Sequence, residues 1–334
     1  MQTRQFRPFG GISALTLGGG GLGQVWGATS RAQALETVAI ALDNGINHLD
    51  VAPMYGRGEA ESVVGEALKG KSTDGLHITT KCQIGTPAEH NVYDRLNASL
   101  TDSLKLLGME KVDLFLMHSQ LIEDDYQLFK HNQLRAKNAT TLSCYFNEVI
   151  PAYERLKQEG KIDNWGIGGM GQKEALLAAL NHEVQPAAVQ CIVNPLNSAG
   201  GISYVSETFD PKIILQTCQN NDIPILAIRA VQAGALTSSM DREPHPSGFD
   251  AEDFKDFDRA APFRQLANQW DESPASLAHR YALSIPKVGS VILGVKNKTE
   301  LEECLQAERQ GPLSTCLLYT SPSPRDAHES RMPS

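Results

Sequence analysis

Eight short apolar runs alternate along this chain with amphipathic segments of helical periodicity, and no other feature constrains the fold as much. The runs cover residues 14–18, 46–50, 76–81, 112–118, 164–168, 187–191, 223–228 and 290–294. Strict alternation of strand and helix is typical of a parallel sheet with helices packed outside it. Eight such units predict an α/β fold, a single (β/α)8 TIM barrel; an open doubly wound sheet is the structural alternative.

Residue patterns at the predicted element ends support this alternation. The helix after the first strand begins at Ser30, which forms a capping-box pattern with Gln33, and it stops at Gly45. A later helix begins at the pair Ser273–Pro274. Before the first strand, residues 5–13 (QFRPFGGIS) place two glycines between short runs. This segment predicts an N-terminal β-hairpin that closes the bottom of the barrel.

Composition excludes several classes of partner. The formal net charge of −9 does not favour binding to nucleic acid or to an anionic membrane surface. No apolar run reaches membrane-spanning length, and the N-terminal MQTRQFRPFG has no signal-peptide pattern. The six cysteines lack metal-ligand spacing, which favours free thiols in a reducing compartment and no metal site. We therefore expect a cytoplasmic protein.

The last residues differ in character from the rest of the chain. Residues 316–334 (CLLYTSPSPRDAHESRMPS) are rich in Ser and Pro and lack periodicity, as a disordered tail would be. They also match a translated sequencing-library adapter, so we interpret them as an adapter-derived artefact that replaces the natural C-terminus. With no internal repeat and no linker, residues 1–315 are predicted to form one domain.

Polar residues fall at the ends of several predicted strands. Asp50, Lys81 and His118 end the second, third and fourth strands, and Gln190 lies near the end of the sixth. Tyr55 follows Asp50 by five residues. Because side chains on a strand alternate between two faces, these polar groups are predicted to converge inside the barrel at its C-terminal end. This end carries the active sites of such barrels.

These residue types together suit carbonyl chemistry. Each alone has an ordinary explanation, but a buried lysine needs a partner, and Asp50 is available for Lys81. Tyrosine has an unperturbed pKa of about 10, and a neighbouring ammonium is expected to lower it. Tyr55 would then be the general acid for reduction and the base for oxidation, while His118 orients the substrate oxygen.

Three segments carry a resemblance to a known family. Residues 43–68 (DNGINHLDVAPMYGRGEAESVVGEAL), 77–81 (HITTK) and 113–118 (DLFLMH) resemble the segments of aldo-keto reductases that hold the catalytic Asp, Tyr, Lys and His. Further resemblance follows in order at residues 160–168, 186–196 and 291–303, so it spans about residues 10–308. The resemblance implies Asp50, Tyr55, Lys81 and His118 as the catalytic residues, and NAD(P)H bound extended across the top of the barrel.

The resemblance also implies a set of cofactor-binding positions. These are Gln190, Gly168, Gly169, Arg229, Gly294, Lys296 and Glu303. Lys296 suits a 2′-phosphate, so NADP(H) is expected ahead of NAD(H). Arg229 is expected either to reach a cofactor phosphate or to face solvent.

Several of these positions depart from the family pattern. Gly168 and Gly169 stand where a Ser–Asn pair often holds the nicotinamide carboxamide, and Ile228 replaces an aromatic residue that stacks under the ring. Glu300 stands where the family often has Gln or Arg, and Cys304 where it often has Asn. A carboxylate beside a phosphate is unfavourable, which leaves NAD(H) open.

A second motif competes with this interpretation. Gly18, Gly20 and Gly23 fit the dinucleotide fingerprint G-x-G-x-x-G, but no helix follows directly, and the acidic residue at the expected distance, Asp43, lies at a helix end. We interpret the glycines as a flexible loop near the substrate or cofactor.

The predicted function is an NAD(P)H-dependent oxidoreductase that interconverts aldehydes, ketones or aldoses with alcohols or lactones, a small carbonyl compound or sugar being its substrate. A cofactor-binding redox-sensing subunit with little turnover is the alternative, and a metal-dependent lyase or hydrolase using His48, Asp50 and His118 ranks last. Long loops at about 119–147, 194–210 and 231–257 are expected to shape the substrate site. No sequence feature predicts the oligomeric state.

Overall fold

The computed structural model describes residues 1–87, 91–205 and 209–314, and in it eight parallel strands close into a barrel. In barrel order the strands are β3 (Leu15–Gly18), β4 (His48–Asp50), β5 (His77–Cys82), β6 (Val112–Met117), β9 (Ile162–Gly168), β10 (Val189–Ile192), β11 (Ile225–Ile228) and β12 (Val288–Leu293). Each strand overlaps one predicted run. The closed barrel is confirmed, and the open-sheet alternative is wrong. The predicted tail at 316–334 lies outside the described residues, so its assignment stays a prediction.

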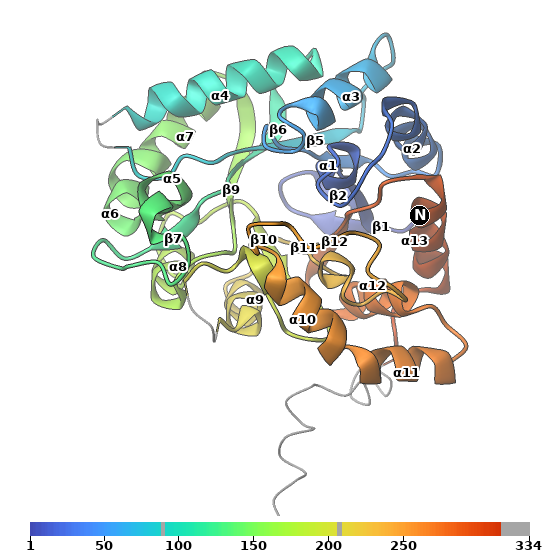
Figure 1. The fold of residues 1–334 in the computed structure, drawn as a ribbon. Helices are drawn as coiled ribbons and strands as arrows, with labels where there is room; N and C mark the ends of the chain where they lie inside the picture. Colours follow the sequence, from blue (N-terminus) through green and yellow to red (C-terminus); the bar gives the residue numbers. More distant parts are fainter. Residues whose placement is uncertain (88–90, 206–208, 315–334) are drawn as a thin grey trace, which may run out of the picture.

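Helices surround the ring of strands (Figure 1). They are α2 (Arg31–Asp43), α3 (Glu59–Leu68), α4 (Val92–Leu107), α7 (Ile150–Gln158), α8 (Lys173–Leu180), α9 (Pro211–Asn220), α12 (Pro274–Ser284) and α13 (Lys298–Gln310). The predicted start signals are confirmed: Ser30 and Gln33 form both hydrogen bonds of a capping box. Ser273 caps α12 by accepting a hydrogen bond from the backbone N–H of Ser276.

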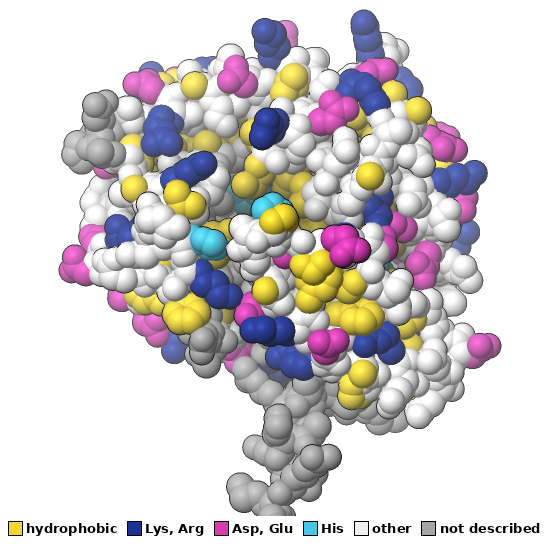
Figure 2. Space-filling view, viewed as in Figure 1, with side chains coloured by type: hydrophobic (Ala, Val, Ile, Leu, Met, Phe, Trp, Pro, Cys, Tyr) yellow, Lys and Arg dark blue, Asp and Glu magenta, His cyan; other side chains and the backbone are white. Residues whose placement is uncertain are grey.

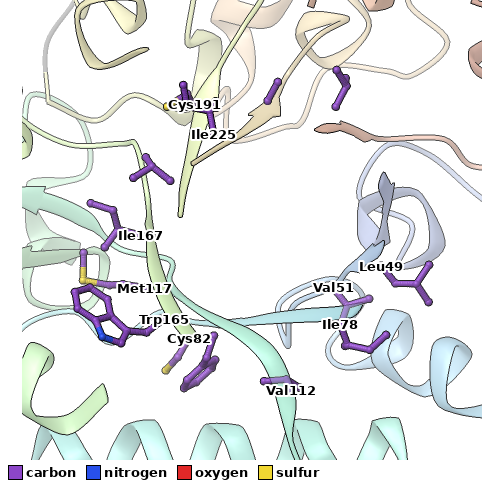
Figure 3. Packing of buried hydrophobic residues seen from close by; sticks show 14 of the residues in the cluster. Leu49, Val51, Ile78, Cys82, Val112, Met117, Trp165, Ile167, Cys191 and Ile225 are labelled. Carbon is purple, nitrogen blue, oxygen red and sulfur yellow. The ribbon is translucent and has the colours of Figure 1, made fainter. Parts of the chain in front are cut away.

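The main apolar core lies between the strands and the helices. Leu49, Ile78 and Phe115 are fully or almost fully buried members of this core. Figure 3 shows Leu49, Ile78 and further core residues around the outer side of the strand ring. The alternation predicted from the sequence therefore holds, and the opposite face of the same strands is left for polar groups.

The N-terminal hairpin closes one end of the barrel. Its strands β1 (Thr3–Phe6) and β2 (Gly10–Ser13) pair antiparallel. Phe6 and Ile12 are buried against Leu114 and Leu226 from the barrel interior. Phe6 also lies so close to Gly289, near the start of β12, that a Cβ there would be 2.5 Å from its ring. The predicted closure of the bottom is confirmed.

A polar layer crosses the barrel above this apolar plug. The His48 ring hydrogen-bonds to the Thr16 hydroxyl through Nδ1 (2.8 Å) and to the Thr79 hydroxyl through Nε2 (2.7 Å). Thr16 also shares a 2.6 Å hydrogen bond with Ser290. Both ring nitrogens of His48 are thus engaged in structural hydrogen bonds.

The three long loops contain secondary structure of their own. The first contains β7 (Gln120–Ile122), η1 (Asn132–Leu134), α5 (Arg135–Asn138), β8 (Ala139–Thr141), α6 (Leu142–Cys144) and the start of η2 (Tyr145–Val149). The second contains η3 (Gly200–Ile202), and the third contains η4 (Gln232–Gly234) and most of α10 (Ala251–Arg259), which α11 (Ala261–Gln269) follows. Because α10 packs on both η3 and η4, the second and third loops form one unit. Among the described helices, none has the length and apolarity needed to cross a membrane.

The glycine-rich segment after β3 is not the flexible loop that we expected. Residues Gly19–Leu22 form a short buried helix, α1. A Cβ at Gly21 would lie 1.8 Å from the carbonyl oxygen of Val295, and one at Gly23 would lie 2.5 Å from that of Tyr55. These glycines are therefore needed for close backbone packing, which also fixes the loop that carries Tyr55.

Candidate active site

Lys81 is the centre of the candidate site. It is fully buried, at the C-terminal end of β5. Its ammonium donates hydrogen bonds to Oδ1 of Asp50 (2.5 Å), to the carbonyl oxygen of Val51 (2.9 Å) and to the hydroxyl of Tyr55 (3.2 Å). The structure therefore brings together three of the four predicted catalytic residues in one hydrogen-bonded chain.

Asp50 is held from a second side by Gln190 of β10. The Gln190 amide donates a 2.6 Å hydrogen bond to the other carboxylate oxygen of Asp50. Burial raises the pKa of Asp50, and Lys81 opposes this. For Lys81, burial lowers the pKa, but Asp50 and Tyr55 more than offset it, so its pKa lies above the ordinary value. Lys81 is thus a buried cation fixed by its anionic partner.

His118 completes the predicted set. Its ring meets the Tyr55 ring edge-on, with centroids 6.1 Å apart. Burial, with a smaller effect of the Lys81 charge, lowers the pKa of His118 to about 3. His118 is therefore a neutral imidazole at physiological pH and can donate one N–H to a ligand.

The pKa of Tyr55 departs from the sequence-based expectation. Lys81 does act to lower it, as expected, but burial raises it by more, and Asp50 adds to the increase. The expected net lowering is wrong. Desolvation of a buried group depends on all the atoms packed around it, so the charge of one neighbouring residue does not determine the net pKa. Tyr55 is thus protonated at neutral pH.

The predicted nicotinamide-binding glycines lie beside this cluster. Gly168 ends β9 and pairs with Gln190 in the barrel. A Cβ at Gly168 would meet only the carbonyl oxygen of Met117 at 3.6 Å, whereas one at Gly169 would lie 2.9 Å from the carbonyl oxygen of Gln190. Gly168 thus has room for a side chain and Gly169 does not. Ile228 is partly buried and packs against a small apolar cluster.

Arg229 lies in a buried ionic network. Its guanidinium forms a short ion pair with Asp253 and donates to the Gln232 side chain at 2.9 Å, and its side chain is only 6% exposed. Asp253 also pairs with Arg242 at 3.2 Å. The solvent-facing alternative is therefore wrong, and contact with a cofactor phosphate would require Arg229 to leave Asp253.

Lys296 is also engaged, by two carboxylates. Its ammonium forms a short ion pair with Asp241 of the third long loop and lies 3.3 Å from Oε1 of Glu300. Gly294, which directly follows β12, lies close to Trp26, whose Nε1 would be 3.0 Å from an added Cβ. A phosphate approaching Lys296 would have to displace Asp241.

The other predicted cofactor positions of α13 are engaged by protein groups. Glu303 accepts a short hydrogen bond from the hydroxyl of Ser273, the N-cap of α12. Cys304 is buried, with its sulfur 3.7 Å from Nε2 of His279. Cys304 therefore does not replace the polar contact that the family Asn offers.

A cavity of about 520 Å³ adjoins the four predicted catalytic residues, Asp50, Tyr55, Lys81 and His118, which we call the tetrad. It is lined by Pro53, Met54, Arg57, Lys81, Cys82, Gln83, Arg95, Ser99 and His118. Figure 2 shows a hollow in this face with histidine side chains beside it and basic side chains over α3 and α4. Arg57, Gln83 and Arg95 were not among the site residues predicted from the sequence. Arg57 and Gln83 follow Tyr55 and Lys81 by two residues each, a spacing that could have indicated them.

The metal-ligand hypothesis finds no support in the site geometry. Within residues 1–87, 91–205 and 209–314, no group of three His, Cys, Asp or Glu side chains is placed to hold a metal ion. His48 and Asp50, which that hypothesis requires, are engaged by Thr16 and Thr79 and by Lys81 and Gln190.

Comparisons with known proteins agree with the fold and identify the family. The model of the aldo/keto reductase family matches residues 14–316, so the chain belongs to this family. It is 24% identical to L-galactose dehydrogenase of Arabidopsis thaliana over 89% of this chain and 84% of the relative. It is also 24% identical to D-threo-aldose 1-dehydrogenase of a Pseudomonas species, over 87% and 88% respectively.

Solved structures show the same fold. An aldo-keto reductase of Bacillus halodurans in its holo form superposes with a TM-score of 0.70 at 21% identity, covering 96% of this chain and 95% of that one. One from Klebsiella pneumoniae in complex with NADP and acetate gives 0.64 at 21% identity, covering 96% and 93%. Family membership makes the protein an NAD(P)-dependent oxidoreductase of the aldo-keto reductase type.

Proposed function

We propose that the protein interconverts aldehydes or ketones, aldoses included, with alcohols or lactones, and that Tyr55 transfers the proton. The observation that carries this proposal is the buried chain in which Lys81 bonds both Asp50 and the Tyr55 hydroxyl. A tyrosine, a fixed ammonium and a neutral histidine supply what carbonyl reduction needs at the oxygen atom: a proton, charge stabilisation and orientation.

The bound nicotinamide supplies or accepts the hydride at the carbonyl carbon. In reduction Tyr55 donates its proton to the carbonyl oxygen, and Lys81 stabilises the tyrosinate that remains. In oxidation the tyrosinate takes the proton of the substrate hydroxyl. Asp50 keeps Lys81 charged and in place, and His118 donates its N–H to the substrate oxygen. The raised pKa of Tyr55 keeps its hydroxyl protonated at neutral pH, as the acid role requires.

We propose Gln190, Gly168 and Gly169 as neighbours of the nicotinamide. The open space at Gly168, beside the catalytic cluster, supports this placement. The adenosine end would lie near Gly294, Lys296 and Glu303, and Arg229 would join only after leaving Asp253. NADP(H) is proposed ahead of NAD(H), because Lys296 offers an ammonium to a 2′-phosphate that takes the place of Asp241.

The test combines equilibrium binding with turnover. NADPH and NADH are titrated by fluorescence, and a panel of aldehydes, ketones and aldoses is then followed at the nicotinamide absorbance. Tyr55→Phe should bind the cofactor as wild type does but lose roughly 10²-fold or more of the rate. The matched control is Tyr93→Phe on α4, whose hydroxyl contacts Glu159 outside the site. Wild type that binds without turnover would favour the redox-sensing alternative, and absence of binding would contradict both.

A further inference from the structure

The cavity beside the tetrad carries an unbalanced positive charge. Two arginines line it, Arg57 and Arg95, and no Asp or Glu does. Lys81 is neutralised by Asp50, and the lowered pKa of His118 keeps that ring uncharged. The chain as a whole has a formal net charge of −9, so the positive charge of two guanidinium groups at this cavity is opposite in sign to the overall charge.

The acidic residues near Arg57 are engaged elsewhere. Glu59 forms an ion pair with Arg31 at 2.7 Å. Glu61 is buried and accepts a 2.6 Å hydrogen bond from Thr80. Among the residues that the structure describes, neither Arg57 nor Arg95 has a salt-bridge partner. Both guanidinium groups therefore keep their capacity to bind an anion.

The backbone places Arg57 at the cavity at a cost. Arg57 has a φ of 56°, in the left-handed region, between Gly56 and Gly58, which also have positive φ. Glycine or asparagine would suit that conformation better than arginine. Strain of this kind at a cavity wall is a reason to look for a functional charge.

Arg95 reaches the cavity from a different element. It lies in the first part of α4, one turn before Ser99, so both residues lie on the same side of that helix and both line the cavity. Gln83, just after β5, also lines the cavity. The cavity lining thus combines two guanidinium groups, a hydroxyl and an amide with Lys81 and His118 of the tetrad.

We propose that the substrate carries an anionic group, a carboxylate or a phosphate, that Arg57 and Arg95 bind while its carbonyl carbon lies at Tyr55. Planar guanidinium groups bind such oxyanions through paired hydrogen bonds. This inference rests on the proposed function and narrows its substrate class from uncharged aldoses to anionic carbonyl compounds.

Matched substrate pairs test the inference. The probes are 4-oxobutanoate against butanal for the carboxylate, and glyceraldehyde 3-phosphate against glyceraldehyde for the phosphate. At least one anionic member should have a kcat/KM roughly tenfold or more above that of its neutral partner, and added KCl should reduce only the anionic rate. The arm with the larger ratio identifies the anionic group. Equal values in both pairs would overturn the inference while leaving the proposed function standing.

Two substitutions and a control link the effect to the cavity. Arg57→Asn removes the charge and suits the backbone, and Arg95→Gln removes the second charge. Each should lower the anionic-to-neutral ratio several-fold, and together by roughly tenfold or more. Arg309→Gln, on an exposed arginine of α13, should leave the ratio unchanged.

A binding measurement separates this inference from the proposed function. Saturation-transfer NMR with unreactive succinate and with succinamide needs no turnover. Succinate should bind wild type in preference to succinamide, and the preference should disappear in the double variant. If no carbonyl compound is turned over but succinate still binds in this way, the anion site stands and the proposed function fails. Equal binding of both compounds would overturn the anion site.

Discussion

The ammonium of Lys81 lies 2.5 Å from Oδ1 of Asp50, and both side chains are almost completely excluded from solvent. Breaking a buried pair leaves an uncompensated charge, which costs about 3–5 kcal/mol. We expect Lys81→Met to lower the free energy of unfolding in urea by that amount, and Asp50→Asn/Lys81→Met to recover much of it. The control is Lys111→Met: its pair with Asp163 is exposed, so the change should be within about 1 kcal/mol. A similar loss for both lysine variants would contradict the assignment.

The raised pKa of Tyr55 predicts different pH profiles for the two reaction directions. Oxidation needs the tyrosinate, so its kcat/KM should increase about tenfold per pH unit below the tyrosine pKa. Reduction needs the protonated form and should be nearly constant from about pH 6 to about pH 9. Because the pKa of His118 lies at about 3, neither profile should bend near pH 6.5. Initial rates across this range, in both directions, provide the check; an oxidation rate independent of pH would remove Tyr55 as the base.

His48 predicts a loss of stability in acid. Burial lowers its pKa to about 3, against an unperturbed value near 6.5. The unfolded chain therefore binds a proton that the folded protein does not, so this contribution is present above about pH 6.5 and is lost as the pH falls towards 3. In His48→Gln the slope of the unfolding free energy against pH should decrease by up to about 1.4 kcal/mol per pH unit, which corresponds to one proton. Thr101→Ala, at an exposed position of α4 that does not ionise, should keep the wild-type slope.

The sequence predicted what depends on strand alternation. Asp50, Lys81 and Gln190 lie on three strands, and their side-chain direction follows from a period of two once the strands are parallel. The sequence did not predict which residues of the long loops would pair with residues that follow the strands. Arg229 meets Asp253 from 24 residues away, and Lys296 meets Asp241 from 55 residues away. No local pattern encodes such contacts.

The glycine-rich segment was misjudged for a related reason. Gly21 and Gly23 are required by backbone groups of Val295 and Tyr55, which approach only in the folded barrel. In the sequence, the same glycines are compatible either with conformational freedom or with close backbone packing, and only the tertiary structure distinguishes these two possibilities. The net pKa of Tyr55 could not be predicted from the sequence for the same reason, because burial of its hydroxyl depends on the assembled site.

The space at Gly168 predicts a gain in cofactor affinity. A Cβ there would make only an ordinary contact with the carbonyl oxygen of Met117 at 3.6 Å, so Gly168→Ser should change stability by less than about 0.5 kcal/mol. Its hydroxyl could bond the nicotinamide carboxamide and lower the Kd of NADPH several-fold. Gly169→Ser is the matched contrast: its Cβ would lie 2.9 Å from the carbonyl oxygen of Gln190, and we expect a loss of about 1–3 kcal/mol. Fluorescence titration and urea unfolding of both variants measure this, and an unchanged or weaker Kd for Gly168→Ser would place the nicotinamide elsewhere.

The ion pair between Asp241 and Lys296 predicts how the chain discriminates between cofactors. Asp241 occupies the ammonium that a 2′-phosphate would need, and Glu300 adds a second carboxylate at 3.3 Å. Asp241→Asn should therefore tighten NADPH binding by roughly three- to tenfold while leaving NADH nearly unchanged, since NADH has no charge at that position. Asp222→Asn, at an exposed pair with Lys287, serves as the control and should alter neither Kd. If Asp241→Asn tightened both cofactors equally, Asp241 would act by holding the third long loop across the cofactor site and not by competing with the phosphate. A Kd for NADPH that did not change would place the 2′-phosphate away from Lys296 altogether.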